Sequence, residues 1–198
     1  MNKPFSQACE NNKQAIYATL KPYLAHKKSV LEIASGTGQH AVYLGQQMPH
    51  LQWQTSDLID KHQGILQWIS DAGLTNVLPP LTWNVTTPPP VEQPVDAVFM
   101  ANTLHIMSQS TVQQCIAQLP KLVVVGGLLC IYGPFNYKGQ YTSESNAAFD
   151  QWLQARDHAS GIRDVEWVNQ QLEDAGFTIE QDHPMPANNR LLVYLFKG

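Results

Sequence analysis

The chain has 198 residues, of which 43% are hydrophobic and 14% are charged, and its formal net charge at pH 7 is −4. This length fits one domain with a continuous core, and the low charge excludes extensive disorder. The acidic balance argues against a nucleic-acid partner, because neutralising phosphates takes a concentrated Lys/Arg surface and no basic cluster beyond Lys27-Lys28 occurs.

The N-terminal residues lack an apolar signal region, and no run approaches the roughly 20 apolar residues that a membrane span needs. Cys9, Cys115 and Cys130 are widely spaced and form no CxxC pair, which argues against a disulfide framework and against a zinc site. We therefore expect a cytoplasmic protein with reduced thiols, no membrane contact and no bound metal.

The first half of the chain predicts a ligand-binding loop. Apolar residues recur at helical spacing over residues 11–23, and Val30–Ile33 is an apolar strand. The small residues 34–38 then lead into a helix over residues 39–48. A ligand can lie against such a backbone, and the first N–H groups of the helix attract anionic or acceptor groups.

The middle and end of the chain predict a mostly parallel sheet. Strands are expected over residues 51–57, 81–85, 95–101 and 128–132, and they alternate with helices over 59–72 and 109–119. Further helices are expected over 146–156 and 165–175. The last two strands, over 177–181 and 191–196, are joined by a short loop and must be antiparallel, so the sheet gains one reversed strand.

The glycine motif by itself leaves the cofactor open. Gly36–Ala41 satisfies G-x-G-x-x-G/A, and Asp57 stands where dinucleotide enzymes hold the ribose. Glu32, however, interrupts the apolar strand just before the loop, where a carboxylate receives an amine and repels a phosphate. Glu32, the absence of a second nucleotide-binding half and the reversed final strand disfavour a nicotinamide cofactor.

With these features the sequence resembles the class I S-adenosylmethionine-dependent methyltransferases over most of its length. In detail it is similar to a small methyltransferase-like family of about this length that is known as a domain of unknown function. The segments that carry this likeness are Ala8–Lys13, Ser56-Asp57, Ala101–Ile106, Gly133–Phe135, Gly161–Asp164 and Met185–Asn189.

The resemblance implies a three-layer α/β sandwich around a Rossmann-like seven-stranded sheet, in the order 3-2-1-4-5-7-6 with strand 7 antiparallel. It implies one domain over residues 1–198, with residues 1–27 as a lid and residues 133–164 as an insert that covers the substrate. The implied enzyme transfers a methyl group from S-adenosylmethionine to a small molecule by in-line displacement and releases S-adenosylhomocysteine.

The resemblance also assigns the cofactor contacts. Glu32 would face the methionyl end of the cofactor, Asp57 would accept both ribose hydroxyls, and Asn84 would accept the adenine amino group. The full predicted set is Asn12, Glu32, Ala34, Ser35, Gly36, Gly38, Asp57, Leu58, Asn84, Val85 and Ala101. Other roles stay open: Glu32 as an ion-pairing residue, Asp57 as a helix cap, and Asn84 as a turn former.

Acceptor contacts follow from the rule that ligands of open α/β sheets bind beyond the carboxyl ends of the strands. Asn102 and His105 follow the fourth strand and are the catalytic candidates, with His105 either a general base or a structural hydrogen-bonding residue. The candidate substrate residues are Phe135, Tyr137, Arg163 and Asn188. Aromatic packing and an Arg163–Asp164 network are the structural alternatives for these residues.

Two competing functions stay open at this stage: a non-catalytic sensor or interaction module that binds S-adenosylmethionine, and an NAD(P)-dependent oxidoreductase. The acceptor atom is undetermined, and so is the choice between a monomer and a homodimer.

Overall fold

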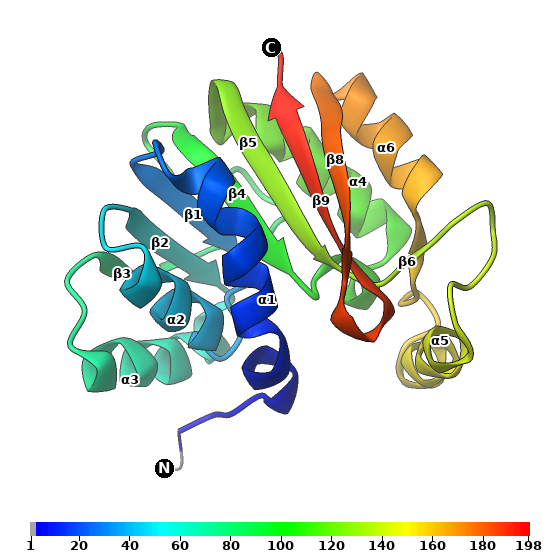
Figure 1. The fold of residues 1–198 in the computed structure, drawn as a ribbon, viewed down its shortest axis with the longest axis horizontal. Coiled ribbons are helices and arrows are strands. Elements are labelled where there is room, and N and C mark those ends of the chain that lie inside the picture. Colours follow the sequence, from blue (N-terminus) through cyan, green and yellow to red (C-terminus); the bar gives the residue numbers. More distant parts are fainter. Residues whose placement is uncertain (1–2) are drawn as a thin grey trace.

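The computed structural model describes residues 3–198, which form a three-layer α/β sandwich (Figure 1). The strands of its main sheet are β1 (Ser29–Ile33), β2 (Gln52–Asp57), β3 (Val77–Thr82), β4 (Val95–Ala101), β5 (Val123–Gly133), β8 (Phe177–Met185) and β9 (Asn189–Phe196). The helices are α1 (Gln7–Leu24), α2 (Gln39–Gln47), α3 (His62–Ala72), α4 (Gln109–Gln118), α5 (Glu144–Arg156) and α6 (Val165–Asp174).

The strand order of the sheet is β3-β2-β1-β4-β5-β9-β8. This is the predicted order, because β8 and β9 are the sixth and seventh strands of the main sheet, while β6 and β7 form a separate small ladder. The first five of these strands pair in parallel, and β9 runs antiparallel to both β5 and β8. The expected single reversed strand is confirmed, because the short connection between β8 and β9 forces the chain to turn back.

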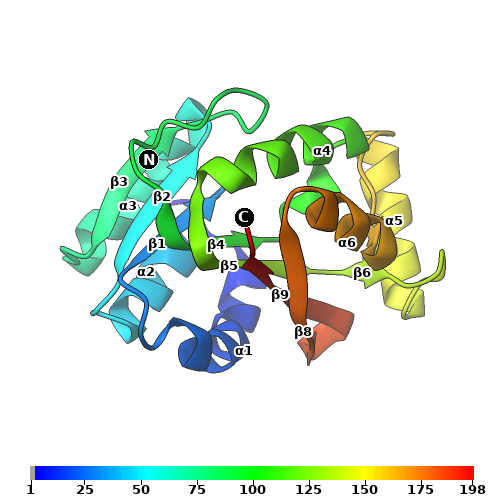
Figure 2. The same cartoon turned by 90° about the horizontal axis from the view of Figure 1, so that it is seen from above.

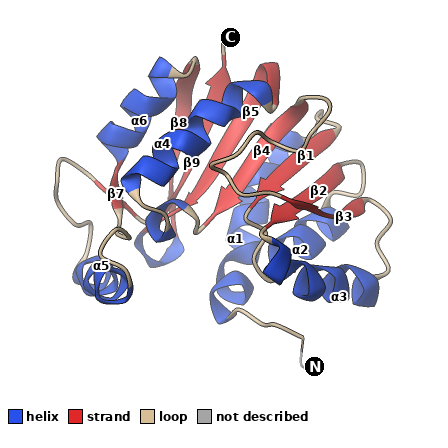
Figure 3. Cartoon of the chain, turned by 180° about the vertical axis from the view of Figure 1, so that it is seen from behind, coloured by secondary structure: helices blue, strands red, loops and turns tan. Residues whose placement is uncertain are grey.

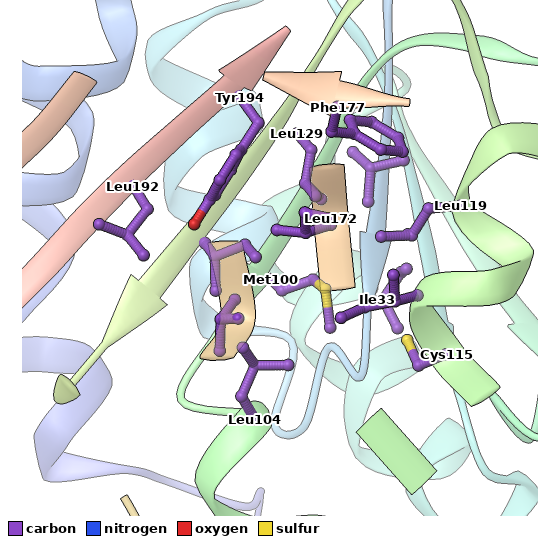
Figure 4. Close-up of a cluster of buried hydrophobic side chains, with 14 of the residues drawn as sticks. Ile33, Met100, Leu104, Cys115, Leu119, Leu129, Leu172, Phe177, Leu192 and Tyr194 are labelled. Carbon is purple, nitrogen blue, oxygen red and sulfur yellow. The ribbon is translucent and has the colours of Figure 1, made fainter. Parts of the chain in front are cut away.

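Alternating side chains of the strands divide the apolar core between the two faces of the sheet. The view from above shows the helices that cover these faces, with α1 and α2 on one side and α4 and α6 on the other (Figure 2). In β4, Ala97 and Phe99 pack with α1 and α2, whereas Val98 and Met100 pack with α4 and α6. Figure 4 shows the second cluster, in which Met100 lies with Leu172 of α6 and Cys115 of α4. Both faces are therefore buried, which accounts for the continuous apolar strands.

Two strand boundaries differ from those predicted. The third strand lies earlier, at Val77–Thr82, and includes Pro79 and Pro80. Prolines are tolerated there because β3 is an edge strand and its pairing with β2 is interrupted at this point, where the register shifts between Gln54 and Ser56. The final strands are longer than expected, since the predicted loop over 182–190 is mostly strand and the connection shortens to Pro186–Asn188.

The segment over residues 133–164 leaves the sheet at the end of β5 and carries α5. Its two ends are tied by a small parallel ladder between β6 (Phe135–Asn136) and β7 (Arg163–Asp164), which the sequence did not predict. Figures 1 and 3 show α5 standing apart from the sheet, at the edge where β4 and β5 end. The N-terminal segment reaches the same edge.

Within residues 3–198, no helix has the combined length and apolarity to cross a membrane.

Candidate functional site

A cavity of about 970 Å³ opens at the carboxyl edge of the parallel strands. This volume lies at the upper end of the range of roughly 300–1,000 Å³ for small-molecule sites. Its walls come from the ends of β1, β2, β3 and β4, from the start of α1 and from α5. The predicted site residues that line it are Asn12, Glu32, Ala34, Ser35, Gly36, Asp57, Leu58, Asn84, Val85, Ala101, Asn102 and His105.

The loop after β1 lies open to the cavity because its backbone turns through left-handed conformations. Ala34 has φ 57° and Gly36 has φ 61°. An L-residue in this region costs about 1 kcal/mol or more, so Ala34 is strained here. Nothing but the Ala34 carbonyl lies within 4 Å of where a Gly36 side chain would start, which leaves room for a ligand.

Gly38 does not line the cavity, contrary to its predicted role as a cofactor contact. It caps α2 with φ 87°, and a Cβ atom there would lie 3.1 Å from the Cα atom of Ile65 in α3. The glycine is therefore needed for the close packing of this turn against α3.

Replacing Gly38 with alanine is expected to destabilise the protein by at least about 2 kcal/mol, since a left-handed alanine and a backbone overlap act together. Gly73→Ala is the matched control, because Gly73 also has positive φ but has nothing within 4 Å. Its cost should stay near about 1 kcal/mol. Urea unfolding of both variants measures the difference, and equal losses would refute the packing role.

Glu32 is a buried carboxylate at the inner wall of the cavity. Its Oε2 accepts a hydrogen bond from Trp53 Nε1 at 3.1 Å, and no cation within residues 3–198 forms an ion pair with it. The ion-pairing role considered from the sequence is therefore absent from the described part of the chain. Burial raises the pKa of Glu32 to about 7, against the effect of the Trp53 hydrogen bond.

Asp57 ends β2 and holds the loop in place. Its Oδ2 accepts from the Gly36 N–H and its Oδ1 accepts from the Leu58 N–H, both at 2.7 Å. Each carboxylate oxygen keeps a further lone pair, so the group can still accept two hydroxyl groups from the cavity. Burial raises the pKa of Asp57, and the two backbone hydrogen bonds oppose that rise.

Asn84 lines the cavity, but its amide oxygen already serves a local turn. Oδ1 accepts from the backbone N–H of Thr86 at 3.1 Å and from its hydroxyl at 2.9 Å. The turn former proposed as an alternative is thus observed. Beside it, the exposed Leu58 and the partly buried Val85 form apolar walls, together with Trp83.

Two sets of hydrogen bonds, made by Gln39 and His40 of α2, hold the N-terminal segment next to the cavity. The buried side chain of Gln39 accepts from the Ser6 N–H at 2.5 Å and donates to the Ser6 carbonyl at 3.3 Å. His40 donates from Nε2 to Asn12 Oδ1 at 2.7 Å. Burial lowers the pKa of His40 to about 4, so the ring is neutral at pH 7 and its hydrogen bond to Asn12 joins two uncharged groups.

His105 and Asn102 stand side by side after β4. Asn102 is in the left-handed region at φ 54°, and its N–H donates to the Tyr132 carbonyl at 2.8 Å. The carbonyl of His105 accepts from the Gly161 N–H at 2.9 Å, while its ring lines the cavity without a hydrogen bond to any described residue. Burial lowers the pKa of His105 to about 4, and the charge of Arg163 adds to this effect.

The four predicted substrate residues do not line this cavity. Phe135 is buried in the core beneath α6, and the Tyr137 hydroxyl donates to Asp182 at 2.6 Å. Arg163 donates to the carbonyls of Met107 and Ala159, so it braces the insert without the expected Asp164 pairing. Asn188 is exposed next to the cavity, and its carbonyl accepts from the Asn146 amide at 3.2 Å.

Sequence reasoning missed most of the wall that α5 contributes. Six residues of α5 line the cavity, and they follow the i, i+3, i+4 spacing of one helix face. This spacing was the signal in the sequence that could have identified them as a group. They are Ser145, Asn146, Phe149, Trp152, Leu153 and Arg156. The spacing alone reads as a helix that packs on the sheet, whereas α5 presents this face to the cavity.

Residues 3–196 match the family described as "Protein of unknown function (DUF938)". The chain belongs to this family. The DUF938 chain is also similar in fold to solved methyltransferases, although it spans only 54–57% of the length of the three described next. At 14–18% identity, these similarities establish the methyltransferase fold.

An O-methyltransferase family protein from Burkholderia thailandensis has a TM-score of 0.78 and 18% identity, with 92% of this chain and 57% of that chain covered. The mitomycin 7-O-methyltransferase MmcR has a TM-score of 0.84 and 14% identity, with coverages of 96% and 54%. The O-methyltransferase NcsB1 from neocarzinostatin biosynthesis has a TM-score of 0.79 and 15% identity, again with coverages of 96% and 54%. Its structure contains S-adenosylmethionine and 2-hydroxy-5-methyl naphthoic acid.

Proposed function

We propose that this DUF938 protein is an S-adenosylmethionine-dependent methyltransferase that acts on a small-molecule acceptor. The observation that carries the proposal is Glu32, a buried carboxylate at the cavity wall without a cationic partner within residues 3–198. A buried charge needs compensation, and the ammonium group of the methionyl moiety supplies it. A nicotinamide cofactor would bring phosphates toward the same carboxylate, which disfavours that alternative. The presence of S-adenosylmethionine in NcsB1, which shares the fold, agrees with the proposal.

The other cavity residues fit the remaining parts of this cofactor. Asp57 accepts the ribose hydroxyls, Gly36 lets the cofactor lie on the backbone, and Leu58 and Val85 flank the adenine. When bound, the cofactor supplies an electrophilic methyl group on a positively charged sulfur. The N-terminal segment over residues 6–12 and the insert over residues 133–164 exclude water and hold the acceptor in line with that methyl group.

In the transfer step, the acceptor's nucleophilic atom bonds to the methyl carbon while the carbon–sulfur bond breaks, and the bonding pair stays on sulfur. Neutral His105 takes the proton that the acceptor loses, and Asn102 orients the acceptor beside it. Burial lowers the pKa of His105, so its ring is unprotonated at neutral pH and free to accept a proton, although it is a weaker base than a solvent-exposed imidazole.

Calorimetry with S-adenosylhomocysteine tests the cofactor assignment, and NAD(P) serves as the competing ligand. Incubating the purified protein with cell extract and methyl-labelled S-adenosylmethionine tests the transfer. Binding together with a labelled small product supports the proposal. Tight binding without any product would instead support the sensor, and binding of NAD(P) alone would overturn the cofactor assignment.

Replacing His105 with glutamine is expected to lower the rate of methyl transfer about 10²- to 10⁴-fold, the usual contribution of a general base. The affinity for S-adenosylhomocysteine should not change. At saturating cofactor, the wild-type rate should be flat above about pH 5 and fall toward pH 4, because protonation of His105 removes the base. A rate in the variant within threefold of the wild type would assign His105 a structural role.

A further inference from the structure

The wall that α5 adds to the cavity is aromatic and open. Trp152 on α5 is 52% exposed, and Ile106, which follows β4, is 53% exposed, although both residues line the cavity. Large apolar side chains that line a hollow and stay about half exposed within residues 3–198 indicate a surface that binds an apolar ligand.

The rings on this wall form a continuous series that starts at the catalytic candidate. The rings of Phe149 and His105 meet edge to face, with 5.2 Å between ring centroids and 76° between ring planes. Phe149 in turn stacks on Trp152, with 5.8 Å between centroids and 18° between planes. Because Phe149 stacks on the Trp152 ring and Arg156 also lies over it, the exposed edges of the stack are left for edge-to-face contact with a planar aromatic molecule.

A cation stands at the far end of the series. The guanidinium carbon of Arg156 lies 4.5 Å from the centroid of the Trp152 ring, and no carboxylate within residues 3–198 forms an ion pair with it. The carboxylates among the described cavity residues are Glu32 and Asp57, which belong to the cofactor end. A guanidinium held over a ring keeps its N–H edge available for a carboxylate.

We propose that the methyl acceptor is a planar aromatic acid. Its ring lies against the exposed edges of the Phe149–Trp152 stack, its carboxylate binds Arg156, and its nucleophilic atom faces His105. This assignment rests on the proposed methyltransferase function and adds to it the chemical class of the substrate.

Calorimetry with two matched probes, naphthol and hydroxynaphthoate, tests the assignment on the full chain saturated with S-adenosylhomocysteine. The probes share the ring and the hydroxyl group and differ in the carboxylate. Hydroxynaphthoate is expected to bind at least roughly tenfold more tightly, the effect of a hydrogen-bonded ion pair. Arg156→Gln should remove this preference without changing the affinity for naphthol, whereas Trp152→Leu should weaken both probes.

Lys121→Gln is the control, because it removes one positive charge from an exposed site that does not line the cavity. Its preference for hydroxynaphthoate should equal that of the wild type. Equal affinities for the two probes, a preference that survives Arg156→Gln, or failure of both probes to bind would each overturn the substrate assignment. Binding of S-adenosylhomocysteine is measured first, in a separate titration without either probe. If S-adenosylhomocysteine does not bind, the proposed methyltransferase function fails; if it binds and the probes do not behave as expected, only the substrate assignment fails.

Discussion

Replacing Asp57 with alanine is expected to weaken the binding of S-adenosylhomocysteine at least about 100-fold. Each hydrogen bond to a charged acceptor contributes about 1.5–3 kcal/mol, and two ribose hydroxyls lose their acceptor together. The variant also releases the Gly36 N–H, which Asp57 holds at 2.7 Å, so the loop loses its anchor. Both effects reduce affinity, and calorimetry measures their sum.

Glu180→Ala is the control for this experiment, because Glu180 is an exposed acid that pairs with Lys197, and neither of these two residues lines the cavity. It should bind the ligand as the wild type does. Thermal unfolding without ligand shows whether Asp57→Ala remains folded, and Asp57→Asn, which keeps the shape and one acceptor oxygen, provides a milder second variant. An affinity of folded Asp57→Ala within threefold of the wild type would refute the ribose assignment.

The affinity for S-adenosylhomocysteine is expected to rise about tenfold per pH unit up to about pH 7 and then to level off. Free Glu32 has a pKa of about 7 and must be ionised to hold the ligand's ammonium group. Below pH 7, binding therefore releases a proton. Calorimetry in buffers of different ionisation enthalpy measures that proton directly.

Glu32→Gln should weaken binding and make the affinity independent of pH between 5.5 and 7. It should also stabilise the ligand-free protein at pH 8. The ordinary pKa of 4.5 is raised to about 7 in the folded state, so wild-type stability falls as the pH rises from 4.5 to 7. At pH 8, where this loss is complete, the free energy of unfolding of the variant should exceed that of the wild type by about 3 kcal/mol. Unchanged affinity and unchanged stability in Glu32→Gln would contradict the ammonium site.

Sequence patterns predicted the sheet because they record which residues must be buried. The continuous apolar run 95–101 required a strand covered on both faces, and the short connection before β9 required a reversed strand. Glu32 was informative for the same reason, since a carboxylate inside an apolar strand needs a partner. Each of these inferences depends on residues that are close together in the sequence, so the sequence alone was enough to make it.

Contacts between distant segments were decided by the tertiary structure. Gly38 looked like a ligand contact until α3 was seen to pack against it, and Phe135 looked available until the core closed over it. Arg163 donates hydrogen bonds to two backbone carbonyls. Every residue has a backbone carbonyl, so the pattern of side chains in the sequence could not identify these partners.

The sequence patterns by themselves thus determined the alternation of strands and helices, the reversed last strand and the open loop after β1, whereas the strand order came from the family resemblance. They also singled out Glu32 and Asp57, which both line the cavity. The rest of the cavity wall depended on the direction in which α5 turns the face that carries Phe149, Trp152 and Leu153. Residues at helical spacing show the same periodicity whether their face meets a sheet or a cavity. The ladder between β6 and β7 sets this direction by tying the ends of the insert, and so places Phe149, Trp152 and Arg156 on the cavity wall.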